Sequence, residues 1–73
     1  MGRQRAKQRF LELLNATGHV TTHDLEHDIV LAGEAAGDLR AAAYELETAG
    51  RVIVLRETMA PRGLDFTGLL LPR

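Results

Sequence analysis

The sequence has no cysteine among its 73 residues. Disulfides are therefore excluded, as are thiolate-ligated zinc and iron–sulfur sites, and the composition fits a reducing compartment, with the cytoplasm as the expected location. Long apolar runs are also missing, so neither a signal peptide nor a transmembrane helix is expected. A chain this short is predicted to form one domain, residues 1–73, and such a domain buries only about 60% of the surface that its unfolded form exposes.

Signatures of catalysis are scarce. There is no P-loop and no G-x-S-x-G nucleophile motif. The segment from His23 to His27 spells H-x-x-E-H, the inverted zinc-protease signature, which would place both imidazoles on one helical face. A catalytic zinc also needs a third ligand and a substrate cleft, so we interpret this segment as a polar face, with adventitious metal binding as the alternative. No enzyme activity, resident metal, cofactor or small-molecule substrate is predicted.

Charge is nearly balanced, with a net value of −1, but it is unevenly distributed. Residues 1–16 carry four cations against one carboxylate, residues 17–50 carry one cation against seven carboxylates, and residues 51–73 carry four cations against two. The ends are therefore basic and the middle is acidic. The four N-terminal cations would form either a phosphate-binding arm or a solubilising helix end; they are Arg3, Arg5, Lys7 and Arg9.

Hydrophobic spacing predicts three helices. Apolar residues from Ala6 to Leu14 recur at helical intervals before Gly18, which predicts a first helix over about residues 3–16. A second helix is expected over about 22–31, capped by Thr21 or Thr22, with Leu25 and Ile29 on its apolar side. The third helix, about 34–49, opens at Glu34 and ends at Gly50. Its core stripe consists of Leu39, Ala42, Ala43 and Leu46.

After Gly50 the pattern changes to that of strands. The segments 51–56 and 66–71 predict a β-hairpin over about residues 51–71, and residues 19–21 predict a short extended link. Val52 and Val54 would point to one side of the hairpin while Ile53 and Leu55 point to the other. This second apolar side needs cover, either from the Leu11 region of the first helix or from another chain. We therefore predict a homodimer in which the hairpin or the first helix takes part.

The order helix, link, helix, tight turn, helix and hairpin is accompanied by three segments with a matching residue pattern. They are Phe10-Leu11-x-Leu13-Leu14, Gly18-His19-Val20-Thr21-Thr22-x-x-Leu25 and Leu39-x-x-Ala42-Ala43-x-x-Leu46-Glu47-x-x-Gly50-Arg51-Val52. Together they resemble the core pattern of bacterial winged-helix transcriptional regulators. The resemblance covers nearly the whole chain and implies an α+β fold, with a three-helix helix-turn-helix core followed by a C-terminal hairpin wing. It also implies a transcriptional regulator, or an accessory factor of a mobile element, that binds duplex DNA as a dimer.

In DNA-binding members of that family the third helix enters the major groove, the wing touches DNA, and helix N-termini meet phosphates. The resemblance therefore implies that Arg40 and Tyr44 act in the groove and that Arg62 acts from the wing. The remaining cations and the start of the second helix would contact the backbone. The residues implied to bind DNA are Arg3, Arg5, Lys7, Arg9, Thr22, Arg40, Tyr44, Arg56 and Arg62.

The third helix has a second feature, a narrow stripe formed by Glu34, Asp38 and Glu45. Carboxylates that face phosphates lower affinity, so this stripe should face solvent or a basic partner surface. The opposite face holds mostly small residues, which would let the helix lie deep in a groove; they are Gly37, Ala41 and Thr48, beside Tyr44. The alternative function is a winged-helix protein-interaction module whose acidic stripe docks on a basic protein partner.

Overall fold

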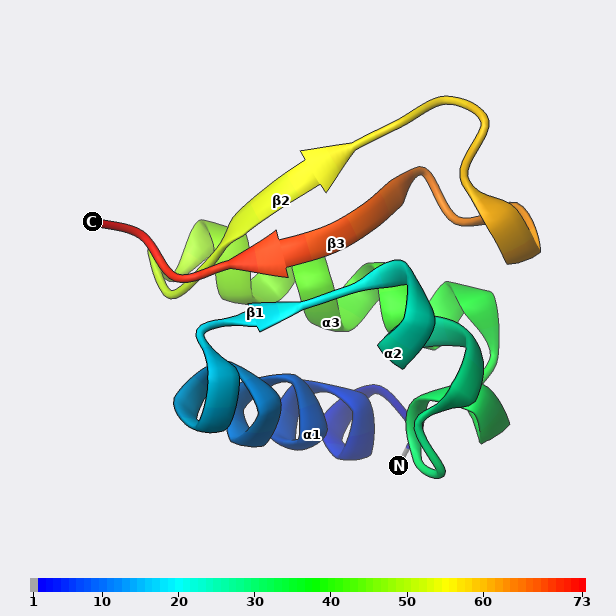
Figure 1. Ribbon diagram of the computed structural model, residues 1–73. Helices are drawn as coiled ribbons and strands as arrows, with labels where there is room; N and C mark the ends of the chain where they lie inside the picture. The colour runs from blue at the N-terminus through cyan, green and yellow to red at the C-terminus, as the bar shows by residue number, and fades with distance from the viewer. Residues whose placement is uncertain (1) are drawn as a thin grey trace.

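Three helices and a three-stranded antiparallel sheet make up the fold in the computed structural model, which describes residues 2–73. The elements in chain order are α1 (Gly2–Thr17), β1 (His19–Val20), α2 (Thr22–His27), the 3₁₀ turn η1 (Leu31–Gly33), α3 (Ala36–Thr48), β2 (Ile53–Arg56), the 3₁₀ turn η2 (Pro61–Gly63) and β3 (Phe66–Leu70). The sheet lies on one side of the helices, and α1 packs against α3 (Figure 1). This α+β arrangement is compatible with a winged-helix layout.

The strand order in the sheet is β1-β3-β2. Val20 of β1 and Val54 of β2 both lie opposite Leu69 of the central strand. The predicted extended link is thus a short strand, and β2 is an edge strand. At Gly68 a side-chain carbon would collide with the backbone carbonyl of Val20, so glycine is needed where β1 approaches β3.

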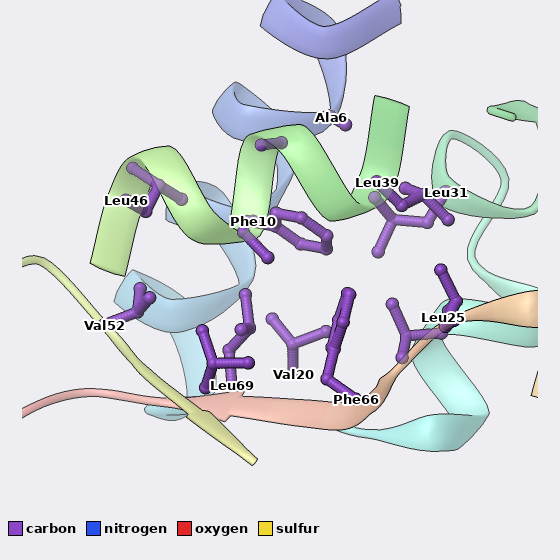
Figure 2. Packing of buried hydrophobic residues seen from close by; sticks show 14 of the residues in the cluster. Ala6, Phe10, Val20, Leu25, Leu31, Leu39, Leu46, Val52, Phe66 and Leu69 are labelled. Atoms are coloured by element: carbon purple, nitrogen blue, oxygen red, sulfur yellow. The ribbon is translucent and has the colours of Figure 1, made fainter. Parts of the chain in front are cut away.

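One hydrophobic core joins the helices to the inner face of the sheet (Figure 2). Phe10 of α1 and Phe66 of β3 are fully buried, and Leu25 of α2 and Leu39 of α3 are buried with them. The core stripe predicted for the third helix is confirmed, because all four of its members are buried. The inner face of the sheet contributes Val20, Val52, Val54 and Leu69.

The second helix is shorter than the predicted range of 22–31. Thr21 caps its start and forms a reciprocal capping box with Asp24. Of the two predicted caps, Thr21 and Thr22, the structure thus selects Thr21. The helix ends at His27, because the Asp28 carboxylate accepts hydrogen bonds from the N–H groups of Val30 and Leu31 and so organises the following turn. Ile29 is 88% exposed, so its predicted place on the apolar side is wrong.

The third helix begins at Ala36 rather than at Glu34, which lies in the turn before it. Its predicted end at Gly50 is confirmed. Gly50 has a φ of 73°, and its N–H donates to the Glu47 carbonyl over 2.9 Å, while the Arg51 N–H donates to the Leu46 carbonyl over 2.8 Å. This pair of bonds is a Schellman motif, which satisfies the last carbonyls of the helix and turns the chain into β2.

The outer face of the hairpin is apolar and lies away from the helices. Ile53 and Leu55 of β2 are 44% and 39% exposed, and Leu70, directly opposite Ile53, is 38% exposed. Leu11 of α1 packs against the core instead, so the predicted cover from the first helix is wrong. Cover from another chain stays a prediction.

Candidate nucleic-acid interface

The cations of the first helix pair with the acidic stripe of the third helix. Glu45 accepts from two of them: Lys7 Nζ lies 2.6 Å from its Oε1 and Arg3 Nε lies 3.0 Å from its Oε2. Arg5 Nε lies 3.9 Å from Glu34 Oε2, a longer contact. The hydrogen bond from Lys7 lowers the pKa of the Glu45 carboxyl, with the charges of Arg3 and Lys7 acting in the same direction. Glu45 and Glu34 of the stripe therefore pair with cations of α1 in the same chain, where the sequence predicted solvent or a basic partner surface.

Asp38, the third member of the stripe, lies near the start of α1. A side-chain carbon at Gly2 would collide with the carboxylates of Asp38 and Glu34, which shows how close they approach this end of the helix. The N-terminus of a helix carries partial positive charge, so carboxylates are favourable there. The α1–α3 contact thus combines ion pairs with a helix-dipole interaction.

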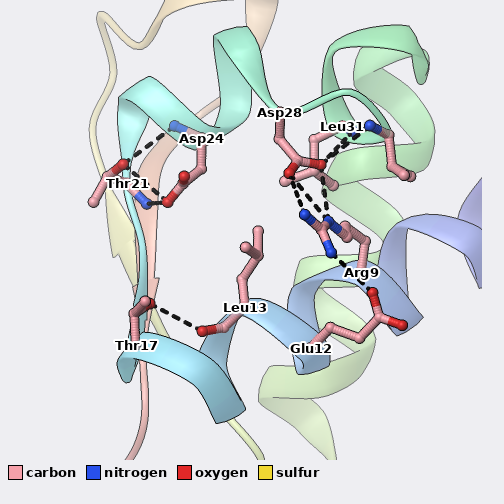
Figure 3. Close-up of polar contacts among 9 residues, drawn as sticks. Arg9, Glu12, Leu13, Thr17, Thr21, Asp24, Asp28 and Leu31 are labelled. Carbon is pink, nitrogen blue, oxygen red and sulfur yellow. Dashed lines mark hydrogen bonds and ion pairs between the residues drawn. The ribbon is translucent and has the colours of Figure 1, made fainter.

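Arg9 is held by a separate carboxylate, that of Asp28 (Figure 3). Its Nη2 donates to Asp28 Oδ1 over 2.7 Å, its Nε donates to the same carboxylate over 3.1 Å, and Nη1 donates to Glu12. The Asp28 side chain is only 9% exposed. The hydrogen bond from Arg9 is the largest cause of its lowered pKa, with the N–H groups of Leu31 and Val30 adding to it. Arg9 therefore fixes α1 to the turn that follows α2.

Arg40, Tyr44 and Arg56 lie on a second surface, which is formed by α3 and the hairpin. The Tyr44 hydroxyl donates to Asp65 Oδ1 over 2.7 Å, and the Arg56 guanidinium lies 5.1 Å from the centre of the Tyr44 ring. Arg56 also binds both carboxylate oxygens of Glu47, over 2.8 and 2.9 Å. Burial, followed by the contact with Asp65, raises the pKa of Tyr44.

Two arginines on this surface donate to neutral acceptors. Arg40 Nη1 donates to the Gly63 carbonyl over 2.8 Å. Arg62 donates to three backbone carbonyls, those of Leu25 and Leu31 through Nη1 and that of Glu34 through Nη2. Within residues 2–73 no carboxylate pairs with either guanidinium, whereas Arg3, Arg5, Lys7, Arg9 and Arg56 each have one. We call Arg40 and Arg62 the hairpin arginines, since both contact or belong to the η2 turn.

The backbone at Arg62 is unusual. Its φ of 62° lies in the left-handed region, which a side chain such as that of arginine seldom adopts. The three carbonyls that its guanidinium binds come from the C-terminal part of α2, from η1 and from the residue after η1, so Arg62 ties the hairpin to the connection between α2 and α3. Sequence patterns did not reveal this, because carbonyl acceptors leave no mark on the residue types.

The other predicted positions have distinct settings. Thr22 Oγ1 donates to the Thr67 carbonyl over 3.0 Å and so joins the start of α2 to β3. Of the small-residue face, Ala41 and Thr48 line a shallow groove between α1 and α3 together with Tyr44. Sequence reasoning omitted Arg51, an exposed cation for which the structure of residues 2–73 shows no ion pair. Its position directly after the helix-ending Gly50 was the available signal.

The His23 and His27 rings lie 4.6 Å apart between centroids, in agreement with their spacing on one helical face. In the part of the chain that the structure describes, no group of three or more histidine, aspartate or glutamate side chains could hold a metal ion. None of the helices described over residues 2–73 has the length and apolar character to cross a membrane.

Comparisons with known proteins add no relative to this picture. The chain matches no family model, and neither a curated protein nor a solved structure matches it significantly.

Proposed function

We propose that this chain is a small winged-helix protein that binds duplex DNA through α3 and the hairpin. The observation that carries the proposal is the position of the hairpin arginines. Arg40 and Arg62 hydrogen-bond to neutral carbonyls, so their positive charges are not cancelled by a paired carboxylate. Arg62 belongs to the η2 turn, and Arg40 of α3 reaches the same turn through the Gly63 carbonyl. A phosphate approaching this turn would meet two cations.

The acidic stripe of the third helix does not oppose this proposal. Glu45 is occupied by Arg3 and Lys7, and Glu34 lies near Arg5. Of the carboxylates on the α3–hairpin surface, Glu47 is paired with Arg56, whereas Asp65 accepts from the neutral Tyr44 hydroxyl and so keeps its negative charge. DNA would therefore meet paired carboxylates at Glu34, Glu45 and Glu47, which lowers the electrostatic cost of binding, while the charge of Asp65 opposes it.

The same charge pattern limits the strength of binding. Each phosphate that is neutralised contributes about −0.9 to the slope of log K against log salt, so two cations predict a slope of about −2. The remaining predicted contacts, including Thr22, Tyr44, Arg56 and the α1 cations, would position the duplex rather than supply most of the charge. Dimerisation would double the contacts, and a role in transcriptional control or as an accessory factor of a mobile element agrees with this mode of binding.

The test is a mobility-shift or anisotropy titration with random-sequence duplex at low and moderate salt. Replacement of Arg40 by glutamine should weaken binding about tenfold and reduce the salt slope by about 1. Arg73→Gln is the matched control, because Arg73 is an exposed arginine outside the α3–hairpin surface, and it should have little effect. Absence of binding at low salt, or equal affinities for the two variants, would reject the proposal. Selection from a random DNA pool should then yield a palindrome if a dimer binds.

A protein-interaction module remains the second candidate. The acidic stripe is a weaker docking surface than the sequence suggested, because α1 already covers it. The exposed apolar side chains on the outer face of the sheet favour an interaction of another kind. Failure of DNA binding combined with retained self-association would support this candidate.

A further inference from the structure

The β2 strand has an unpaired edge. It pairs with β3 on one side, and within the described residues no other strand pairs with it. An edge strand presents N–H and C=O groups that can bind another strand, and proteins usually protect such edges by charge, by proline or by cover. The segment Val52–Leu55 contains neither charge nor proline. Figure 1 shows β2 as the outermost strand of the sheet.

The hydrogen bonds of the sheet determine which groups of β2 point outward. The Glu57 N–H donates to the Asp65 carbonyl, so Glu57 directs its N–H toward the β3 side. The register shifts between Leu55 and Arg56, but the extra residue there, Thr67, belongs to β3. Backbone groups therefore alternate without interruption along β2, and Leu55 and Ile53 also point toward β3. On the opposite edge of β3, the Leu71 N–H donates to the Gly18 carbonyl, so Leu71 directs its backbone groups toward β1. Leu70 and Gly68 therefore direct theirs toward β2, where they lie opposite Ile53 and Leu55. This again places the backbone groups of Ile53 and Leu55 on the β3 side. Val52, Val54 and Arg56 therefore direct their backbone groups to the open edge.

We propose that two copies of this chain associate by antiparallel pairing of their β2 edges about a two-fold axis at Val54. In this register the N–H and C=O groups of Val54 bond to those of Val54 in the second copy. Val52 and Arg56 form equivalent pairs across the axis, and the two sheets become one six-stranded sheet. On the outer face Ile53 lies opposite Leu55 of the second copy, where each contacts an apolar neighbour.

Charge complementarity selects this register and this occupant. Arg51 and Glu57 flank β2 (Ile53–Arg56), and continuing the alternation of the strand past its two ends would place both on the outer face, at either end of the apolar pair. Both are exposed, and neither has an ion pair within residues 2–73. Pairing about Val54 places Arg51 opposite Glu57 of the second copy, twice in each dimer. A shift of the axis to Ile53 would place Arg51 opposite Leu55, and a shift to Leu55 would place Glu57 opposite Ile53, so neither register pairs Arg51 with Glu57. The edge is therefore self-complementary, as a two-fold contact requires.

Sedimentation of the full chain in the absence of DNA tests the proposal independently of the proposed function. The wild type should change from monomer to dimer as its concentration rises. Arg51→Glu and Glu57→Arg should each raise the dissociation constant about tenfold, because two attractive cross-strand pairs become repulsive. The variant that combines both changes should return to within about threefold of the wild type, since it restores both pairs with reversed sign. Glu26→Arg and Arg73→Glu are matched charge controls away from the edge.

Hydrogen exchange gives a second readout at single residues. The amides of Val54 and Arg56 should become protected as the concentration rises, whereas those of Ile53 and Leu55, which face β3, should be protected at every concentration. Circular dichroism identifies any variant that fails to fold, and the exchange pattern of the wild type needs no variant at all.

Four results would overturn the proposal. The first is a wild type that stays monomeric into the high micromolar range, which would leave the edge open to a strand of a different protein. The second is a dimer that both single reversals leave intact, and the third is a double variant no better than the single ones. A dimer with unchanged exchange at Val54 and Arg56 would place the interface elsewhere.

Discussion

The cations on the α1 side of α3 and those on its hairpin side have different hydrogen-bond partners. On the α1 side, Arg3 and Lys7 bind the Glu45 carboxylate, and Arg9 binds Asp28 nearby, so each cation meets an opposite charge. On the hairpin side Arg56 is paired with Glu47, but Arg40 and Arg62 donate to backbone carbonyls, which leave their charges in place. The first arrangement joins helices, and the second combines a structural role with a positive potential. A count of cations from the sequence treats both sides alike and overestimates the number available to a phosphate.

The largest effect is expected on the α1 side, from Asp28→Asn. The Asp28 side chain is 9% exposed and accepts from Arg9 and from two backbone N–H groups, and the amide would leave Glu12 as the one carboxylate paired with Arg9 within residues 2–73. We expect a loss of about 1–2 kcal/mol in the free energy of unfolding by urea. The salt slope of DNA binding should not change, because the hairpin arginines are intact. A loss below about 0.5 kcal/mol would show that the pair contributes no more than an exposed one.

The same carboxylate makes stability depend on acid pH. Its pKa is lowered from an ordinary value of 3.8, mainly by the hydrogen bond from Arg9. A lowered pKa means that the folded state binds the proton less tightly than the unfolded state, so the contribution is complete above the ordinary value and is lost as the pH falls through the lower, folded one. The free energy of unfolding should thus decrease below about pH 4. The decrease should be smaller in Asp28→Asn, and equal decreases in both proteins would assign it to other carboxylates.

On the hairpin side, two replacements of Arg62 separate its structural role from its charge. Arg62→Lys keeps the cation but cannot span three carbonyls, so we expect a loss of about 1 kcal/mol in stability with DNA affinity within about twofold of the wild type. Arg62→Gln should lose similar stability and also bind DNA about tenfold more weakly. Both side chains meet the same left-handed backbone, so strain is matched between the variants. Equal DNA affinities for the two variants would show that the charge of Arg62 does not contribute to DNA binding.

The elements of this fold were more predictable from sequence than its polar contacts. Gly18 and Gly50 have positive φ values and end their helices, and the Thr21–Asp24 cap forms, because these signals act within a few residues. The end of α2 was placed too late, since the apolar character of Ile29 and Leu31 concealed the turn that Asp28 organises. The partners of Arg9, Arg40 and Arg62 lie 19 to 37 residues away, and a carbonyl acceptor can belong to any residue type. Such contacts depend on tertiary packing and not on local spacing.

The smallest expected effect tests the contrast between the two sides of α3 most directly. The substitution leaves cations on the α1 side without a paired carboxylate, as Arg40 and Arg62 are on the hairpin side. Glu45→Gln removes the carboxylate that Arg3 and Lys7 share, and so leaves two uncompensated cations at the α1–α3 contact. If DNA is bound by the cations that have no paired carboxylate, the affinity for DNA should rise about threefold and the salt slope should become steeper. Glu26→Gln, which removes an exposed charge on α2, controls for the change in net charge. An equal rise in both variants would mean that net charge alone governs binding, whereas an increase confined to Glu45→Gln would show that its two ion pairs hold the α1 cations away from phosphate.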